Sequence, residues 1–116
     1  MLKLNLTRPL ACFDIEATGS TPRADRIIEL AVIRIFPDGK RDRHVWRINP
    51  ECPIPAESTT IHGIHDEDVA DCPPFRDVAA EVQEVFAGCD LAGYNLNRFD
   101  IPMLVEEFVR AGMTFE

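Results

Sequence analysis

The feature that most constrains the fold is a pair of apolar segments joined by a short turn. Arg26 to Phe36 is rich in Ile, Val and Leu, and His44 to Ile48 alternates between polar and apolar residues. Between them, Pro37-Asp38-Gly39 supplies turn chemistry, because Pro presets φ and Gly can take φ > 0. Two such segments around a turn predict a β-hairpin, so the chain must build a sheet.

The remaining elements place this hairpin in an α/β fold. Pro9 to Glu16 predicts a strand before the hairpin, and Asn49 to Thr60, with three prolines, predicts a loop. The later predictions are one helical turn at Asp66 to Val69, a helix from Phe75 to Ala87, a buried strand at Leu91 to Tyr94, and a helix from an Asp100 N-cap to Ala111. The order β-β-β-α-β-α predicts a mixed sheet with helices packed on it.

Composition narrows the class of protein. With 116 residues, 46% of them hydrophobic, the chain fits one domain with a modest core. No leader or membrane span is recognisable, and the four cysteines show neither metal-ligand nor disulfide spacing, so we expect a reducing, cytoplasmic compartment. The net charge of −8 argues against a protein that binds nucleic acid through a broad basic surface. Divalent cations held on carboxylates would attract phosphate instead.

Three acidic residues, a pair and a single one, are candidate metal ligands. Asp14 and Glu16 stand at i and i+2 at the end of an apolar strand, so both point to one side of the sheet. Oxygen ligands of this kind suit Mg²⁺ or Mn²⁺, although solvated acids at a strand end are the simpler alternative. Asp100 follows the Leu91 to Tyr94 strand, and it is either an ordinary helix cap or a third carboxylate beside the pair.

The spacing of these motifs resembles a known family. Asp14-x-Glu16-x-Thr18-Gly19 followed by Asp25-Arg26-Ile27-Ile28-Glu29 is similar to the first motif of the DEDD, or proofreading-type, 3′–5′ exonucleases. Tyr94-Asn95-Leu96-Asn97-Arg98-Phe99-Asp100 resembles their second motif, and Ile61-His62-Gly63-Ile64 resembles an element frequent between the two. The likeness covers roughly Leu10 to Gly112.

This resemblance implies a ribonuclease H-like fold, with the hairpin on one side of the first strand and the fourth strand on the other. It implies that Asp14, Glu16 and Asp100 are three of four acidic ligands for two divalent ions, Mg²⁺ or Mn²⁺, that assist hydrolysis of a terminal phosphodiester. The product is a nucleoside 5′-monophosphate. The substrate-binding candidates are Thr18, Gly19, His62, Glu57, Asn95 and Phe99. For the last four, a purely structural or solvated role is the alternative.

The third motif of the family, which supplies the fourth carboxylate, has no match before Glu116, so residues 1–116 are expected to form a partial exonuclease domain. Three functions stay open. The first is an exonuclease acting on single-stranded DNA or RNA 3′ ends, away from membranes, and completed by a further segment, a second copy or a partner chain. The second is binding of nucleotides or nucleic-acid ends without turnover. The third is a non-catalytic interaction module on the same fold.

Overall fold

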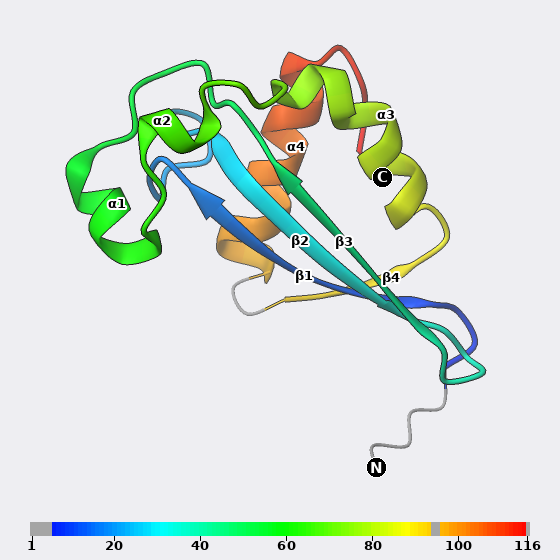
Figure 1. Ribbon diagram of the computed structural model, residues 1–116. Helices are drawn as coiled ribbons and strands as arrows, with labels where there is room; N and C mark the ends of the chain where they lie inside the picture. The colour runs from blue at the N-terminus through cyan, green and yellow to red at the C-terminus, as the bar shows by residue number, and fades with distance from the viewer. Residues whose placement is uncertain (1–5, 94–95, 116) are drawn as a thin grey trace.

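The protein forms a mixed four-stranded sheet in the order β3-β2-β1-β4 (Figure 1). The structure is a computed structural model that describes residues 6–93 and 96–115. The strands are β1 (Leu10–Ala17), β2 (Ile27–Ile35), β3 (Arg41–Arg47) and β4 (Asp90–Ala92). β1 runs antiparallel to β2 and β2 antiparallel to β3, whereas β4 lies parallel to β1 on its other side. The predicted hairpin and strand order are therefore confirmed.

Burial alternates along β1, as its sequence requires. Phe13 and Ile15 are buried in the core, while Asp14 between them is exposed on the opposite side of the sheet. The ladder with β2 is irregular between Glu16 and Ala17, where an extra residue of β2 enters. Such a bulge bends a strand near its end and changes where the next side chains point. The sheet therefore turns at the point where the acidic pair stands.

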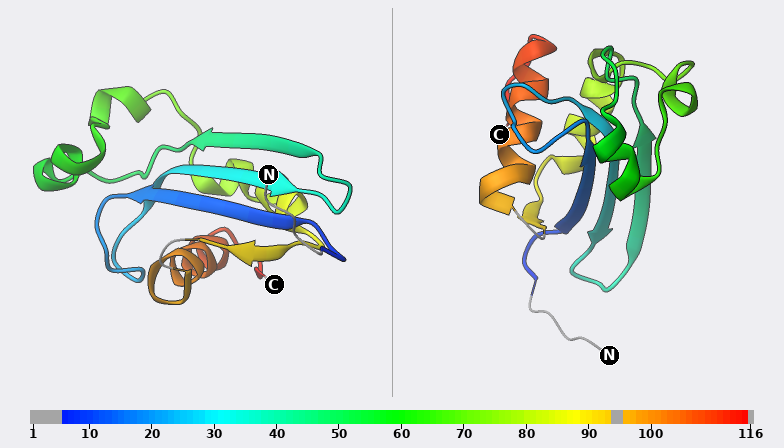
Figure 2. Two further views of the ribbon diagram at one scale, coloured as in Figure 1. Left: turned by 90° about the horizontal axis from the view of Figure 1, so that it is seen from below. Right: turned by 90° about the vertical axis from the view of Figure 1, so that its left-hand side faces the viewer.

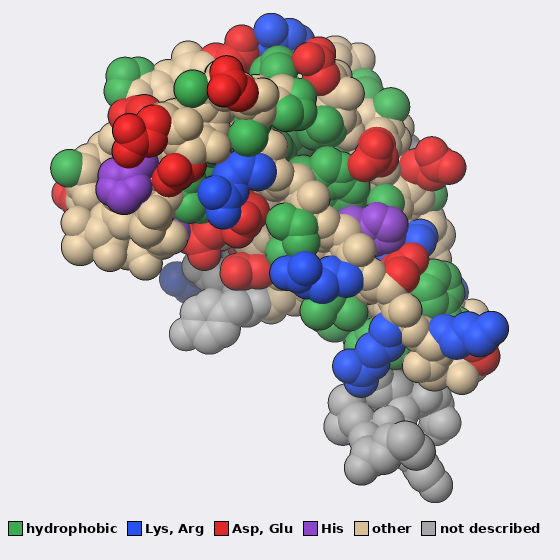
Figure 3. Space-filling model, viewed as in Figure 1, with side chains coloured by type: hydrophobic (Ala, Val, Ile, Leu, Met, Phe, Trp, Pro, Cys, Tyr) green, Lys and Arg blue, Asp and Glu red, His purple; other side chains and the backbone are tan. Residues whose placement is uncertain are grey.

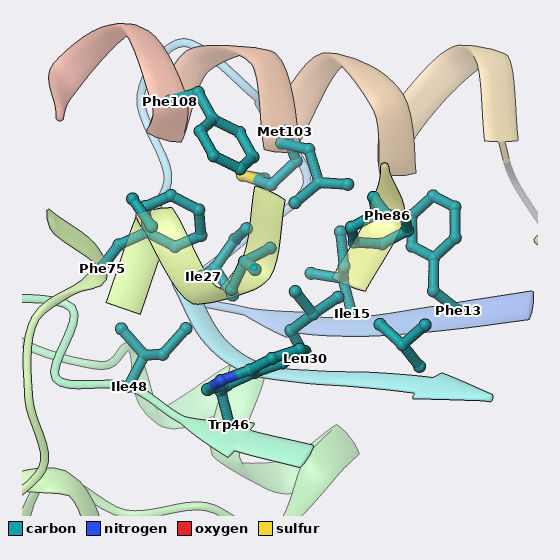
Figure 4. Close-up of a cluster of buried hydrophobic side chains, with 14 of the residues drawn as sticks. Phe13, Ile15, Ile27, Leu30, Trp46, Ile48, Phe75, Phe86, Met103 and Phe108 are labelled. Carbon is teal, nitrogen blue, oxygen red and sulfur yellow. The ribbon is translucent and has the colours of Figure 1, made fainter. Parts of the chain in front are cut away.

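Helices α3 (Phe75–Phe86) and α4 (Ile101–Arg110) pack on the Phe13 side of the sheet (Figures 1 and 2). Figure 4 shows how their aromatic side chains meet those of the strands. Phe13 meets Phe86 edge to face with ring centroids 5.1 Å apart, and Phe75 meets Phe108 in the same way at 5.0 Å. Of the helices in the described ranges, none has the length and apolar character needed to cross a membrane.

The prediction of a loop through Thr60 is wrong in its second half, where helix α1 (Ala56–His62) forms. The helix begins directly after Pro55, a position where a missing N–H costs nothing. It ends at Gly63, whose φ of 74° lets its N–H reach the Thr59 carbonyl at 2.7 Å. Together with α2 (Asp66–Val69), α1 covers a small separate apolar cluster, whose buried members are Ile28, Ile54, Ile64 and Val69.

Asp100 immediately precedes α4, at the position expected of the N-cap, but it does not adopt capping geometry. Leu96–Asp100 forms a π-helical turn that runs directly into α4, and Asp100 itself has helical φ and ψ of −63° and −51°. Because the chain is already helical before Asp100, its side chain makes no capping hydrogen bond. β4 is shorter than predicted, and Tyr94, the end of the expected strand, lies outside the described residues.

The side of the sheet opposite α3 and α4 stays uncovered, and we call it the open face (Figure 3). No side chain on it is fully buried. Its members are Leu10, Cys12, Asp14 and Glu16 from β1, Glu29, Ala31, Ile33 and Ile35 from β2, and Arg41, Arg43, Val45 and Arg47 from β3. One face of the sheet thus makes the core, while the other presents the acidic pair to solvent.

Candidate active site

A cavity of about 680 Å³ opens at the carboxyl end of β1. Four segments line it. The end of β1 forms the floor. The loop over residues 18–25 forms one side, which we call the loop wall, and α1 with Pro55 forms the other, the α1 wall. Phe99 lines it from a fourth segment, the turn before α4. The lining residues are Ile15, Glu16, Ala17, Thr18, Gly19, Ser20, Thr21, Asp25, Pro55, Glu57, Ser58, Ile61, His62 and Phe99. Five of the six substrate-binding candidates therefore share one cavity.

The acidic pair stands beside this cavity. Asp14 is exposed on the open face and Glu16 is half-buried in the cavity lining. Burial raises the pKa of the Glu16 carboxyl, and the charges of Asp14 and Glu29 raise it further, whereas His62 opposes the shift. A carboxylate pair crowded in this way is stabilised by a bound cation. The chemistry of these two donors therefore fits a hard divalent ion.

The loop wall is held by a network around Asp25. Thr18 donates its hydroxyl to the Asp25 carboxylate at 3.0 Å, and the Thr21 amide donates to the same carboxylate at 2.8 Å. A Cβ on Gly19 would lie 2.5 Å from an Asp25 oxygen, so only glycine fits there. The Arg26 amide in turn donates to the Thr18 hydroxyl oxygen at 3.0 Å. The Thr18 side chain is thus occupied within the wall, and the missing Cβ of Gly19 makes room for the Asp25 carboxylate.

The α1 wall is fastened to the end of β1 by two side chains. Ser58 donates its hydroxyl to the Thr18 carbonyl at 2.6 Å. The Ile64 amide donates to Nδ1 of His62, which leaves Nε2 to carry the proton and donate to the Ala17 carbonyl at 3.2 Å. Both ring nitrogens of His62 therefore bind backbone, and the histidine faces the cavity with its carbon edges.

The other substrate-binding candidates differ in position. Glu57 is exposed on the α1 wall, and Phe99 lines the cavity from the π-helical turn before α4. Asn95 lies outside the described residues. Ser58 and Ile61 are site residues that the sequence does not predict, and Ile61 is 85% exposed at the cavity rim. No periodic pattern in residues 56–62 indicates this helix, so nothing in the sequence identifies its rim.

Asp100, the expected third carboxylate, is buried with 4% of its surface exposed and is absent from the cavity lining. Within residues 6–93 and 96–115, no three His, Cys, Asp or Glu side chains form a group able to hold a metal ion. Asp14 and Glu16 can therefore supply two oxygen donors to one ion. A metal role for Asp100 stays a prediction.

A buried carboxylate on α4, Glu107, anchors the base of the loop wall. Only 1% of Glu107 is exposed. Nε of Arg26 donates to its two oxygens at 3.0 and 3.1 Å, and the Ile27 amide donates to one of them at 2.7 Å. One helical turn later, Arg110 donates to the carbonyls of the same loop, at Pro22, Arg23 and Asp25. The helix that begins next to Asp100 thus holds the opposite end of the cavity wall.

A family comparison decides the class of protein. The RNase_T model, described as exonuclease, matches residues 11–115. The chain belongs to this exonuclease family. The match includes the acidic pair, both cavity walls and α4. The cavity is therefore the candidate active site of this exonuclease-family domain.

Two similar proteins are named as DNA polymerase III or as resembling one of its subunits. A DNA polymerase III PolC-type protein of Caldanaerobacter subterraneus subsp. tengcongensis is 32% identical over 104 residues, 90% of this chain and 7% of the relative. A DNA polymerase III subunit epsilon-like protein of Rhodobacter capsulatus is 33% identical over 107 residues, again 90% of this chain but 15% of the relative. The chain therefore corresponds to a small part of each of these proteins.

A solved structure shares the fold. The zinc-ion-bound E. coli ExoI–ssDNA complex superposes with a TM-score of 0.83 at 22% identity, covering 91% of this chain and 24% of that one. The mixed sheet with flanking helices is thus the ribonuclease H-like fold expected from the sequence.

Proposed function

We propose that this domain removes nucleoside 5′-monophosphates from the 3′ ends of single-stranded nucleic acid by metal-assisted hydrolysis. One observation carries the proposal: the crowded Asp14 and Glu16 carboxylates stand at the mouth of a cavity of about 680 Å³. This volume lies within the range of roughly 300–1,000 Å³ that is usual for small-molecule sites, so a terminal nucleotide fits. The polymerase names of the relatives favour DNA over RNA.

In this proposal Asp14 and Glu16 hold a divalent ion, Mg²⁺ or Mn²⁺, and Asp100 contributes to a second position. Such an ion lowers the pKa of a bound water and neutralises charge on the leaving oxygen. The protein itself orients the substrate. Phe99 packs against the terminal base, the backbone at Gly19 approaches the sugar, and the α1 wall excludes water from the cavity.

The roles of Glu57 and His62 are assigned by position. Glu57 is exposed on the cavity side of α1, where its carboxylate accepts a hydrogen bond from a sugar hydroxyl. His62 acts as a positioning residue, because its ring fixes α1 to Ala17 one residue after Glu16.

The thiols of Cys12, Cys52, Cys72 and Cys89 are unpaired, which supports the reducing, cytoplasmic compartment proposed here.

A second candidate function, nucleotide binding without turnover, is favoured by the position of Asp100. Asp100 is buried outside the cavity lining, so the carboxylates that face the cavity mouth hold one ion rather than two. A single ion can bind a phosphate group, but it cannot both activate the attacking water and neutralise the leaving oxygen of a phosphodiester.

Release of monophosphate from a 3′-labelled single-stranded oligonucleotide distinguishes hydrolysis from nucleotide binding without turnover. The assay is run with Mn²⁺ or Mg²⁺, with DNA and with RNA, and with Asp14→Ala in parallel. Stepwise shortening that disappears in the variant supports hydrolysis. Absence of shortening, together with a metal-dependent thermal shift that disappears in Asp14→Ala, supports binding alone. A thermal shift unchanged in Asp14→Ala would reject the assignment of the pair.

A further inference from the structure

The open face carries a row of arginines along β3. Arg41, Arg43 and Arg47 all alternate to this side, and all three are exposed. With Lys40 in the preceding turn, four of the 12 basic residues of the chain lie within residues 40–47. In a protein with a net charge of −8, this is a local reversal of sign. Figure 3 shows basic and hydrophobic side chains following one another along this part of the surface.

In the part of the chain that the structure describes, two of these arginines have no acidic partner. Arg47 pairs with Glu29 at 2.9 Å, so its charge is already offset. Asp42, the only acid between Lys40 and Arg47, points to the helix side of the sheet and pairs there with Arg34. Among the residues that the structure describes, Arg41 and Arg43 form no ion pair. Their guanidinium groups therefore remain available for an anion from solution.

The strand register places this row near the acidic pair. Asp14 is opposite Ala31, and Ala31 is opposite Val45, so Val45 and Asp14 share one row across the sheet. Arg43 lies one side-chain repeat further along β3. With strands about 4.8 Å apart and same-face residues about 6.7 Å apart, the Cα atoms of Arg43 and Asp14 are separated by roughly 12 Å. That distance matches a few nucleotides of extended chain rather than one.

The surface between Asp14 and Arg43 is apolar. Ile33 is 39% exposed and Val45 42% exposed, and Ala31 lies opposite Val45 and one same-face repeat from Ile33. An exposed apolar strip next to cations fits a ligand that carries both flat apolar groups and regularly spaced negative charges. A single strand of nucleic acid has both, whereas a duplex hides its base faces.

We propose that the single strand upstream of the 3′-terminal nucleotide crosses the open face from Asp14 to β3. Its phosphates bind Arg41 and Arg43, and its bases pack on Ile33 and Val45. This inference rests on the proposed function, which places the 3′ end at the β1 cavity. It also explains how a chain of net negative charge retains an oligonucleotide, because the attraction is confined to one strip.

The test compares two double variants of the 116-residue chain, Arg41→Ala/Arg43→Ala and the control Arg8→Ala/Arg76→Ala, which removes the same charge from exposed arginines outside the strands of the open face. Binding of a fluorescent 12-nucleotide oligo-dT is measured in EDTA from 50 to 200 mM NaCl. For the first variant, the slope of log K against log salt should become less steep by about 1.4, which is 0.7 for each of two phosphates. Arg41→Lys/Arg43→Lys should keep the slope, and the control should not change it.

Equal slopes for the first variant and the control would overturn the proposal, as would duplex DNA binding as tightly as the single strand, or no oligonucleotide binding at 50 mM NaCl. Binding of dTMP with Mn²⁺, by calorimetry, reports on the cavity separately. It should be unaffected by Arg41→Ala/Arg43→Ala and lost in Asp14→Ala. If dTMP binding fails while the arginine-dependent slope persists, the proposed function is at fault and the open-face strip is supported.

Discussion

The two walls of the cavity are built in different ways. The loop wall is held from behind by the buried Glu107, which binds Arg26 and the Ile27 amide, and by the internal Asp25 network. Among the described residues, Ser58 and His62 fasten the α1 wall to the end of β1, beside a small apolar cluster separate from the main core. One wall is thus part of the main core, and the other is an attached unit. We expect the first to set the position of the nucleotide and the second to open for its entry.

The largest expected effect comes from removing the anchor of the loop wall. Glu107→Ala leaves the half-buried Arg26 guanidinium and the buried Ile27 amide without their acceptor. Breaking a fully buried pair typically costs about 3–5 kcal/mol, and the partial exposure of Arg26 places the expected loss at about 3 kcal/mol. Urea denaturation should show a loss of this size. Glu107→Gln, which keeps an acceptor oxygen, is the control, and equal stability of the two variants would contradict the anchoring role.

A smaller effect is expected at Gly19. An added Cβ would lie 2.5 Å from Asp25, so Gly19→Ala forces the loop wall to shift at an estimated cost of about 1–3 kcal/mol. dTMP affinity should fall with it. Ser20→Ala, on the same loop, is the neutral control. In a double-mutant cycle, Asp25→Ala should absorb part of the Gly19→Ala cost; strictly additive free energies would argue against this contact.

On the α1 wall, removing one hydrogen bond should destabilise α1 more than the rest of the domain. Ser58→Ala removes the hydrogen bond to the Thr18 carbonyl and should cost about 1–2 kcal/mol. Hydrogen exchange should accelerate in α1 more than in α3 or α4. Thr60→Ala, whose hydroxyl only bonds back to Ala56 within α1, should leave exchange nearly unchanged. Uniform acceleration across the domain would mean that both walls belong to one cooperative unit.

The smallest stability effect is expected for Ile61, on the rim of the α1 wall. Because its side chain is exposed, Ile61→Ser should change the free energy of unfolding by less than about 0.5 kcal/mol. Its contribution is made only when a nucleotide is present, so dTMP affinity should fall severalfold. The matched change Val109→Ser, at an exposed site on α4, should alter neither quantity. Unchanged affinity in Ile61→Ser would exclude the rim from binding.

Parts of this architecture were predictable because they repeat. The strands carry a period of two and α3 a helical period, and the same alternation correctly placed Asp14 and Glu16 on one side of β1. Helix α1 has no such pattern. Its sequence, Ala-Glu-Ser-Thr-Thr-Ile-His, has one large apolar residue, which points outward, so its stability comes from contacts at the end of β1.

The anchors of the loop wall escaped prediction for a related reason. A glutamate in a helix ordinarily indicates a solvent-exposed side, and nothing near Glu107 in the sequence reveals that its partners lie 80 and 81 residues away. Asp25 was noticed only as part of a motif, without a role. A metal role for Asp100 beside Asp14 and Glu16 stays a prediction.

The long sequence separation between Glu107 and Ile27 has a consequence for the order of assembly. Contacts between segments so far apart form late, because closing the intervening chain costs entropy before the contact is gained. The β1–β2–β3 meander has only local pairings and can form early. The loop wall cannot settle until α4 docks. During synthesis on the ribosome, a nascent chain would therefore have the acidic pair in place before it has a finished cavity.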